Sequence, residues 1–201
     1  MELKGIDLLN DNKFLKFYLA EYENSGKSIP YYFTSRNEVP NLSCVRNKRN
    51  SQILPNAIEA FTYIKNENES KIVMIKEFRA TLNSWIYSFP AGLIEKGESA
   101  EDALIREVSE EIGGEIKDFK FLQNYPVAMC VGVSDESNML AVVELNELKE
   151  QHLDEGENIQ VVSFNPKELK EKIVNNELKL TASGLLGVII LLQKFGFYDI
   201  F

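Results

Sequence analysis

Short apolar runs separated by polar turns cover much of the chain and predict strands. The clearest pair occupies residues 58–64 and 72–75, on either side of a polar turn at residues 66–70. A third run, at residues 85–89, is stopped by a proline at position 90. Further strands are expected at residues 119–125, 139–145 and 159–164.

Two aromatic-rich runs near the start of the chain predict a hairpin. They cover residues 14–22 and 29–35 and flank Glu23-Asn24-Ser25-Gly26-Lys27, whose composition is that of a turn. We expect this hairpin to form an arm, residues 1–52, that precedes a main domain of residues 53–201.

A helical pattern is clearest at residues 100–112. Leu104, Val108 and Ile112 recur every four residues and form one apolar stripe that would face the core. Ser99 is a suitable N-cap, and Gly113 lies where a helix commonly ends in the left-handed conformation. The strands surround the helices without strict alternation, which predicts a mixed α/β sandwich rather than a Rossmann sheet. Two more helices are expected, at residues 166–175 and 181–195.

Composition narrows the class of protein. The chain has 201 residues, of which 44% are hydrophobic and 26% charged, as in one globular domain with an added arm. A formal charge of −9 argues against nucleic acid as a partner, because phosphate backbones require clustered cations. No apolar run is long enough to cross a membrane, and the first residues lack a signal-peptide profile. With only two cysteines, Cys44 and Cys130, we expect a cytoplasmic protein with reduced thiols that are at least partly buried.

Two isolated features carry little weight by themselves. The basic stretch at residues 46–49 is expected to be a solvated loop, or else a local attraction for an anionic ligand. His152, the only histidine, lies in a polar stretch and is expected at the surface rather than in a catalytic site.

The helix at residues 100–112 concentrates carboxylates. Glu107 and Glu111 are four residues apart on a face other than the apolar stripe, and Glu110 lies beside them. Like charges at this spacing destabilise an isolated helix, so something must offset their repulsion. A divalent cation is the natural candidate, because Mg²⁺ prefers carboxylate oxygens and completes its shell with waters and substrate phosphates.

The loop before this helix supplies complementary groups. Gly92 lets the backbone approach a ligand closely, which would offer the Ala91 carbonyl as another oxygen ligand. Glu98 can reach back to pair with Arg106 and hold the loop against the helix. The alternative is an exposed helix whose glutamates face water. Chance would place all these residue types at these fixed offsets with a probability on the order of 10⁻⁵.

This stretch resembles the Nudix box, whose pattern is Gly, five residues, Glu, seven residues, and then Arg-Glu-apolar-any-Glu-Glu-any-Gly-apolar. Every position matches except the last, where Gly114 replaces an apolar residue. The resemblance implies an α/β/α sandwich with a mixed sheet, which hydrolyses nucleoside diphosphates linked to a variable group with Mg²⁺, or Mn²⁺ in its place. It also implies a metal and catalytic cluster of Glu107, Glu110, Glu111 and the Ala91 carbonyl, with Glu98 and Arg106 as structural partners.

Most of the chain is similar to the ADP-ribose pyrophosphatase branch of this family. Glu77-Phe78-Arg79 stands at that branch's distance before residues 89–92, although Gln is usual at position 77. The resemblance implies that Arg79 contacts the phosphates or the terminal ribose of the substrate. Ser88, where an acidic residue is common, and Ala80, where proline is usual, depart from the branch.

Residues 31–36 are similar to the segment of that branch that carries an aromatic residue and an arginine toward the nucleotide. By this resemblance Tyr31 would stack on adenine and Arg36 would lie over the base. The resemblance also implies that the arm crosses a homodimer. The alternative is a hydrophobic strand with Arg36 in solvent.

Three positions stay open for the general base. Residues 132–137 resemble the loop that supplies it in this branch, with Glu136 deprotonating the attacking water. Glu157 lies in a second acidic cluster, at a place from which some relatives supply a carboxylate. A base outside both loops is the third possibility.

The resemblance predicts water attack on the diphosphate of ADP-ribose, giving AMP and ribose 5-phosphate. Two alternatives stay open, a hydrolase of UDP- or GDP-sugars and a module that binds ADP-ribose without cleaving it. Sensing modules often have eroded box carboxylates, whereas the box of this chain is complete. The preference among substrates, the number of metal ions and the phosphorus that is attacked stay open.

Overall fold

The computed structural model describes residues 1–48, 53–67, 69–153 and 155–200, and the chain divides into two compact units. The first unit contains Met1–Asn56 and Asn124–Met139, and the second contains Ala57–Gln123 and Leu140–Phe201. Arg49 of the basic stretch and the expected end of the arm at residue 52 lie outside the described residues. The two units are described separately.

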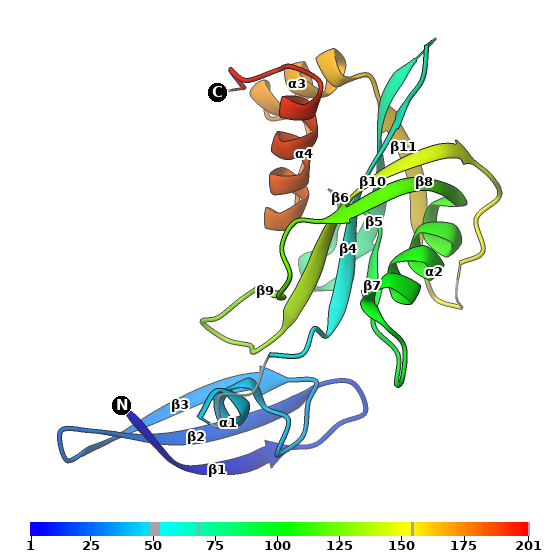
Figure 1. Ribbon diagram of the computed structural model, residues 1–201. Coiled ribbons are helices and arrows are strands. Elements are labelled where there is room, and N and C mark those ends of the chain that lie inside the picture. Colours follow the sequence, from blue (N-terminus) through cyan, green and yellow to red (C-terminus); the bar gives the residue numbers. More distant parts are fainter. Residues whose placement is uncertain (49–52, 68, 154, 201) are drawn as a thin grey trace. The chain divides into compact units, whose positions relative to one another are not determined.

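The first unit is built on an antiparallel sheet in the order β1-β2-β3 (Figure 1). The predicted hairpin is confirmed as β2 and β3, which pair from Lys16 with Ser35 to Asn24 with Lys27. The sequence did not predict β1, because polar residues interrupt its apolar positions and most of its side chains are exposed. The bounds are β1 (Glu2–Asn10), β2 (Lys16–Asn24) and β3 (Lys27–Ser35).

One face of this sheet packs against a short helix, α1 (Ser43–Lys48) (Figure 1). Tyr18, Ala20 and Phe33 from the strands and Leu42 before the helix form a buried cluster. The rings of Tyr18 and Phe33 stack with their centroids 5.5 Å apart. The first unit therefore has a small hydrophobic core of its own.

Residues 124–139 complete the first unit. They contain β9 (Val127–Ala128), which pairs with the first residues of β10 (Ser137–Leu148). A parallel bridge joins Ser134 of this segment to Thr34 of β3. This loop thus belongs to the same compact unit as the N-terminal sheet, although about a hundred residues separate them in the sequence.

The second unit contains a mixed sheet in the order β11-β5-β4-β10-β8, with β6 beside β5 and β7 beside β4. The neighbours β4 and β10 run in the same direction (Figure 1), whereas β5 is antiparallel to β4, β6 and β11. The remaining bounds are β4 (Ala57–Lys65), β5 (Ser70–Arg79), β6 (Ser84–Ser88), β7 (Ala91–Leu93), β8 (Gly114–Phe121) and β11 (Ile159–Phe164).

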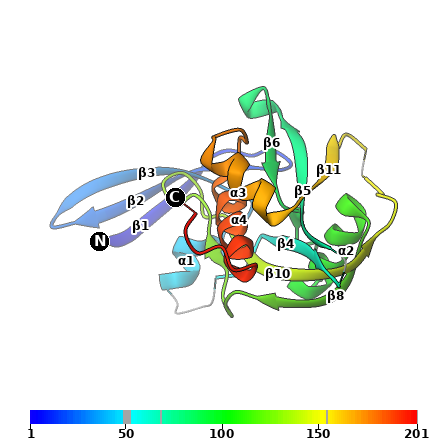
Figure 2. The ribbon, with the colours of Figure 1, turned by 90° about the horizontal axis from the view of Figure 1, so that it is seen from above.

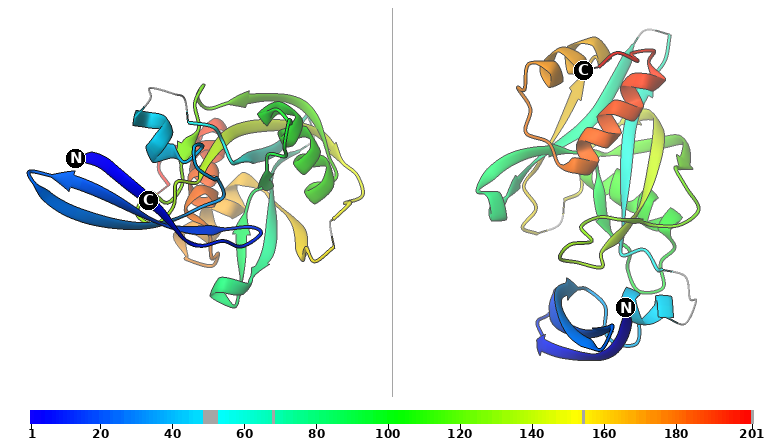
Figure 3. Two further views of the ribbon diagram at one scale, coloured as in Figure 1. Left: turned by 90° about the horizontal axis from the view of Figure 1, so that it is seen from below. Right: turned by 90° about the vertical axis from the view of Figure 1, so that its left-hand side faces the viewer.

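Helices cover both faces of this sheet (Figures 1 and 2). On one face α2 (Ala100–Ile112) contacts β4, β7 and β8, and on the other α4 (Ala182–Lys194) contacts β4 and β6. The helix α3 (Pro166–Val174) lies on the same face as α4 and contacts β5 (Figure 3). A short 3₁₀ helix, η1 (Ala80–Leu82), joins β5 to β6. The predicted α/β/α sandwich with a mixed sheet is confirmed.

The ends of α2 have the geometry that the sequence predicts. The hydroxyl of Ser99 accepts a hydrogen bond from the backbone N–H of Asp102 at 3.1 Å, and Gly113 has a φ of 62°. The strand β8 covers Gly114–Phe121, whereas the sequence predicts residues 119–125. Charged residues interrupt the apolar pattern in the first half of β8, so its true start is not evident from the sequence. A Cβ at Gly114 would lie 2.7 Å from Cγ1 of Val108, so glycine at this box position allows close packing of β8 on α2.

Among the described helices, none is both long enough and apolar enough to span a membrane. Both cysteines are free thiols; Cys44 is half-buried as expected, whereas Cys130 is exposed, so the expected burial is wrong for Cys130. Burial raises the pKa of the Cys44 thiol.

Gly187 lets α4 approach the sheet closely, and this predicts the effect of one added methyl group. A Cβ there would lie 2.5 Å from Cδ1 of Phe61 and 2.6 Å from Cε2 of Phe89, two rings packed edge to face. Gly187→Ala should therefore lower the free energy of unfolding by about 1–3 kcal/mol, despite the higher helix propensity of alanine. Urea denaturation followed by the fluorescence of Trp85, the only tryptophan, measures this change.

The matched control is Leu186→Ala, at a neighbouring position of α4 that is 41% exposed. It should change the free energy of unfolding much less than Gly187→Ala does. Equal effects of the two substitutions would show that the close approach at Gly187 is not what limits the packing.

Candidate active site

The predicted metal ligands lie on the buried side of α2. Glu107 and Glu111 are 8% and 4% exposed, whereas Glu110 is partly exposed. Burial raises the pKa of both Glu107 and Glu111, the latter to about 8, and the neighbouring charge of Glu157 adds to each rise. Two buried carboxylates on successive helical turns are costly unless a proton or a cation neutralises them.

The strand β7 brings backbone groups against these carboxylates. The N–H of Ala91 donates to Oε2 of Glu111 at 2.9 Å. A Cβ at Gly92 would lie 1.8 Å from Oε1 of Glu107, so only glycine leaves room for that carboxylate. Carboxylates and backbone carbonyl groups are the kind of oxygen donors that a hard divalent cation binds.

A closed cage of side chains is not required for such an ion. Mg²⁺ commonly binds through one or two carboxylates and keeps several waters or substrate phosphates in its shell. Among the residues that the structure describes, no group of three or more Asp, Glu, His or Cys side chains is arranged as a metal cage. The oxygen donors that are present fit a hard divalent cation that completes its shell with waters or phosphates.

Arg106 connects the loop before α2 to the carboxylates. Its guanidinium donates to both oxygens of Glu98, with Nε–Oε1 and Nη2–Oε2 distances of 2.9 and 3.1 Å. It also donates to Oε1 of Glu107 at 2.6 Å and to Oε2 of Glu110 at 3.2 Å. The hydrogen bonds from Arg106 hold the pKa of Glu98 below its ordinary value. Loop and helix are thus joined by one planar cation.

Two carboxylates outside the box lie close enough to influence it. Glu77 on β5 pairs with Arg79, with Nη2 and Oε2 2.8 Å apart. The charges of Glu77 and Glu157 both contribute to the raised pKa of Glu111, after burial and the charge of Glu107. From the sequence, Glu77 stood out only because Gln is usual at its position. The available signal was that residues 73, 75 and 77 of one strand share a face, which places Glu77 beside buried residues.

The remaining predicted residues meet in the first unit. Nε of Arg36 lies 3.7 Å from Oε1 of Glu136, and the hydroxyl of Tyr31 donates to the carbonyl of Val131 at 3.3 Å. Arg36 also donates to the carbonyl of Phe14 at 3.5 Å. The structure therefore brings Tyr31 and Arg36 to the loop that carries Glu136, and it brings the box residues together in the second unit.

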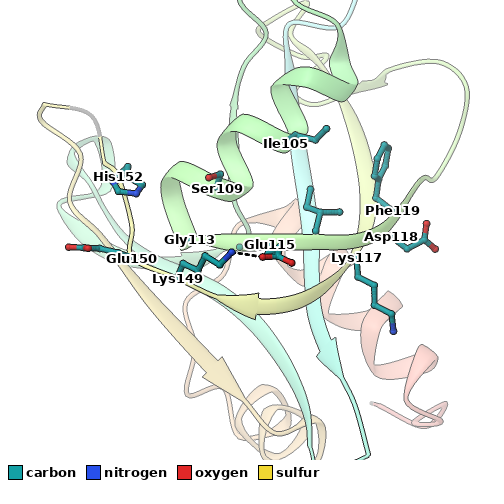
Figure 4. Close-up of a pocket in the computed structure, with 12 residues that line it drawn as sticks. Ile105, Ser109, Gly113, Glu115, Lys117, Asp118, Phe119, Lys149, Glu150 and His152 are labelled. Carbon is teal, nitrogen blue, oxygen red and sulfur yellow. Dashed lines mark hydrogen bonds and ion pairs between the residues drawn. The ribbon is translucent and has the colours of Figure 1, made fainter.

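A cavity of about 560 Å³ lies on another side of α2 and does not include the box carboxylates (Figure 4). Residues of α2, β8 and the segment after β10 line it, and Lys149 pairs with Glu115 in its wall. His152, which also lines it, is exposed, and its backbone N–H donates to the carbonyl of Glu110 at 2.9 Å. The charged groups here are largely paired with each other or exposed, so we place the candidate site at the buried box.

Glu59 is a buried carboxylate that was not predicted from the sequence. It lies in β4, is 3% exposed, and stands opposite Ala91 in the ladder between β4 and β7. Burial raises its pKa to about 7, and a hydrogen bond with Ser183 and the charge of Arg79 oppose that rise. The available signal was a charged residue with apolar neighbours on both sides, since Ala57, Ile58, Ala60 and Phe61 flank it.

A model of the Nudix domain matches residues 55–183 of the chain. The chain belongs to the Nudix family. It is 31% identical over 156 residues to the ADP-ribose pyrophosphatase of Bacillus subtilis, covering 77% of this chain and 80% of that protein. It is 36% identical over 77 residues to the ADP-sugar pyrophosphatase of Mus musculus, covering 37% of this chain and 34% of that protein.

The fold has a counterpart among solved structures. It matches the crystal structure of an ADP compounds hydrolase with a TM-score of 0.70 at 16% identity, over 100% of this chain and 98% of that one. At this identity the likeness shows the Nudix fold alone. Together with the family match, the curated relatives make the chain a Nudix hydrolase.

The buried carboxyl of Glu59 predicts a dependence of stability on pH. Its pKa is about 7 in the folded protein and about 4.3 in an unfolded chain. Between these values the folded state holds a proton that the unfolded state has lost, so the free energy of unfolding falls as pH rises. Glu59→Gln should remove this fall, which is on the order of 3 kcal/mol.

Urea denaturation in EDTA from about pH 4 to about pH 8 measures the free energy of unfolding across the range in which it should fall. The effect of Glu59 is the difference between wild type and variant at each pH. Glu67→Gln, an exposed position, is the matched control and should follow the wild type. A wild-type-minus-variant difference that stays constant across this range would contradict the prediction.

Proposed function

We propose that this Nudix hydrolase cleaves the diphosphate of ADP-ribose into AMP and ribose 5-phosphate, using Mg²⁺ or, in its place, Mn²⁺. The observation that supports it most is the pair of buried carboxylates, Glu107 and Glu111, packed against the backbone of Ala91 and Gly92. The relative from Bacillus subtilis, which matches most of this chain, is named for action on ADP-ribose.

In this proposal Glu107, Glu111 and the carbonyl of Ala91 hold the cation, with Glu110 in the same cluster. A bound divalent cation neutralises charge on the diphosphate and lowers the pKa of a coordinated water. Arg106 keeps the donor set assembled, because it ties the loop of Glu98 to the helix that carries the ligands. Such pre-organisation means that little rearrangement is needed when the substrate binds.

Two arginines and a tyrosine bind the substrate in this proposal. Arg79 contacts a phosphate or the terminal ribose, and its ion pair with Glu77 limits the directions in which its guanidinium can point. Tyr31 stacks on adenine and Arg36 lies over the base. We further propose a homodimer formed through the arm, and a cytoplasmic location.

Glu136 is the proposed general base, which accepts the proton of the attacking water. Its ion pair with Arg36 gives the carboxylate a fixed neighbour. Glu157 is the alternative base. Its electrostatic influence on Glu107 and Glu111 also suits a role in holding the cation.

Removing one buried carboxylate tests the metal assignment. Glu111→Gln should lower turnover by at least about 100-fold, because it removes a metal ligand, while the fold remains. Steady-state kinetics with Mg²⁺ or Mn²⁺ measure turnover, and circular dichroism monitors the fold. Glu101→Gln, an exposed position of the same helix, should keep wild-type turnover. Near-normal Mg²⁺-dependent activity of Glu111→Gln would refute the assignment.

A substrate panel tests the proposed specificity. We expect kcat/KM for ADP-ribose to exceed those for UDP-glucose and GDP-mannose by at least about 10-fold, with ADP-glucose as an ADP-linked comparison. Chromatography of the products with Mg²⁺ and with Mn²⁺ should identify AMP. Faster cleavage of UDP- or GDP-sugars would favour a nucleotide-sugar hydrolase, and binding of ADP-ribose without products in excess Mg²⁺ would favour a sensing module.

A further inference from the structure

The loop that carries Glu136 is attached to the N-terminal sheet through Thr34 of β3. The backbone N–H and the hydroxyl of Thr34 donate to the carbonyl of Val133 at 2.8 and 3.0 Å. The backbone carbonyl of Thr34 accepts from the N–H of Asp135 at 3.4 Å. Through the parallel bridge between Thr34 and Ser134, the loop adds a short parallel segment to the edge of this sheet.

A second attachment joins the same loop to α1. Ser43, the first residue of α1, donates its N–H to Oδ2 of Asp135 at 3.0 Å. The first N–H groups of a helix have no partner inside the helix, so this carboxylate satisfies one of them. The other oxygen, Oδ1, is buried without a hydrogen-bond partner among the described residues. Loss of the Ser43 bond would remove a hydrogen bond from this half-buried carboxylate, which favours movement of the loop toward water.

The helix end that holds Asp135 is itself fixed. Leu42, directly before α1, is fully buried in the core of the first unit. Its carbonyl accepts from the N–H groups of Val45 and Arg46, each at 3.0 Å. Asp135 is thus tied to a packed part of the arm and not to a free loop.

Hydrogen bonds hold the backbone of Glu136 and of the residue after it. Its N–H donates to the hydroxyl of Ser134 at 3.0 Å, and its carbonyl accepts from the N–H of Met129 at 3.0 Å. The next residue, Ser137, donates its N–H to Oδ1 of Asn56 at 3.1 Å. The backbone that aims the Glu136 side chain is therefore fixed on both sides by residues of the same unit.

We propose that Thr34 and Asp135 are positioning residues, through which the arm sets the orientation of Glu136 within one chain. The inference rests on the proposed function, in which Glu136 is the base. Displacement of a catalytic group by about 1 Å can lower a rate about 100-fold. A loosened loop should therefore lower kcat, while the affinity for the metal ion, which the box determines, stays unchanged.

The first variant removes the backbone N–H of residue 43. Ser43→Pro deletes the N–H that bonds Asp135, and proline is well tolerated at the first position of a helix. Leu42 holds the N-cap position, where the extended backbone that proline requires of its predecessor is usual. Ser43→Ala keeps the N–H and is the matched control.

A second variant tests the other attachment. Thr34→Val removes the hydroxyl bond to Val133 and keeps the backbone bonds. Its matched control is Thr62→Val, which removes a similar hydroxyl bond, 2.7 Å long, to the carbonyl of Val73 in the second unit. All variants are made in the full chain.

Hydrogen exchange and kinetics are measured on each variant. Amides of residues 129–137 should exchange at least about 10-fold faster in Ser43→Pro and Thr34→Val than in the wild type, and at wild-type rates in the two controls. The same two variants should lose at least about 10-fold in kcat without a change in Mn²⁺ affinity. In a Glu136→Gln background they should cause no further loss, because the group that they position is already gone.

The outcomes separate the inference from the function beneath it. Unchanged exchange of the loop in both variants would overturn the inference, whatever the activity. A loss of kcat equally large in the Glu136→Gln background would also overturn it, because the residues would then act by another route. A loosened loop together with normal turnover of Glu136→Gln itself would support the attachment and overturn the choice of Glu136 as base.

Discussion

The burial of two like charges on successive turns of α2 is the constraint around which the second unit is organised. Glu107 and Glu111 face the sheet, where little water can solvate them, and burial raises the pKa of both carboxyl groups. Arg106 supplies one positive charge to Glu98, Glu107 and Glu110 at once. The negative charge still exceeds the positive, which gives a divalent cation a favourable place to bind.

The other parts of the second unit keep this imbalance in place. Glycine at position 92 admits the carboxylate of Glu107, and the left-handed turn at Gly113 leads the chain directly into β8. The segment after β10 returns to the end of the helix, where Lys149 and His152 donate to the carbonyls of Gly113 and Glu110. The same segment then leads toward Glu157. The C-terminal end of α2 is thus held by the segment that follows β10.

What the sequence predicted well is local. The cap of α2, its left-handed end and the pairing of Glu98 with Arg106 follow from residues within one loop and one helix. The influence of Glu77 on Glu111 was not predicted because it joins residues of two elements that are far apart in the sequence. Likewise, the contact of Thr34 with Val133 joins residues that are 99 positions apart, and no short sequence pattern predicts it. Strand β1, with few buried side chains, has too weak a pattern to detect.

The first unit is discontinuous in sequence, and this limits which segments can be exchanged between related proteins without loss of its packing. Its sheet and α1 come from the beginning of the chain, whereas the loop that completes it is an excursion from the second unit's own strands. An N-terminal segment transplanted from a relative would have to accept the Asp135 loop, or the loop would have to be transplanted with it. The amino-acid sequences of the two stretches are therefore expected to change together as members of the family diverge.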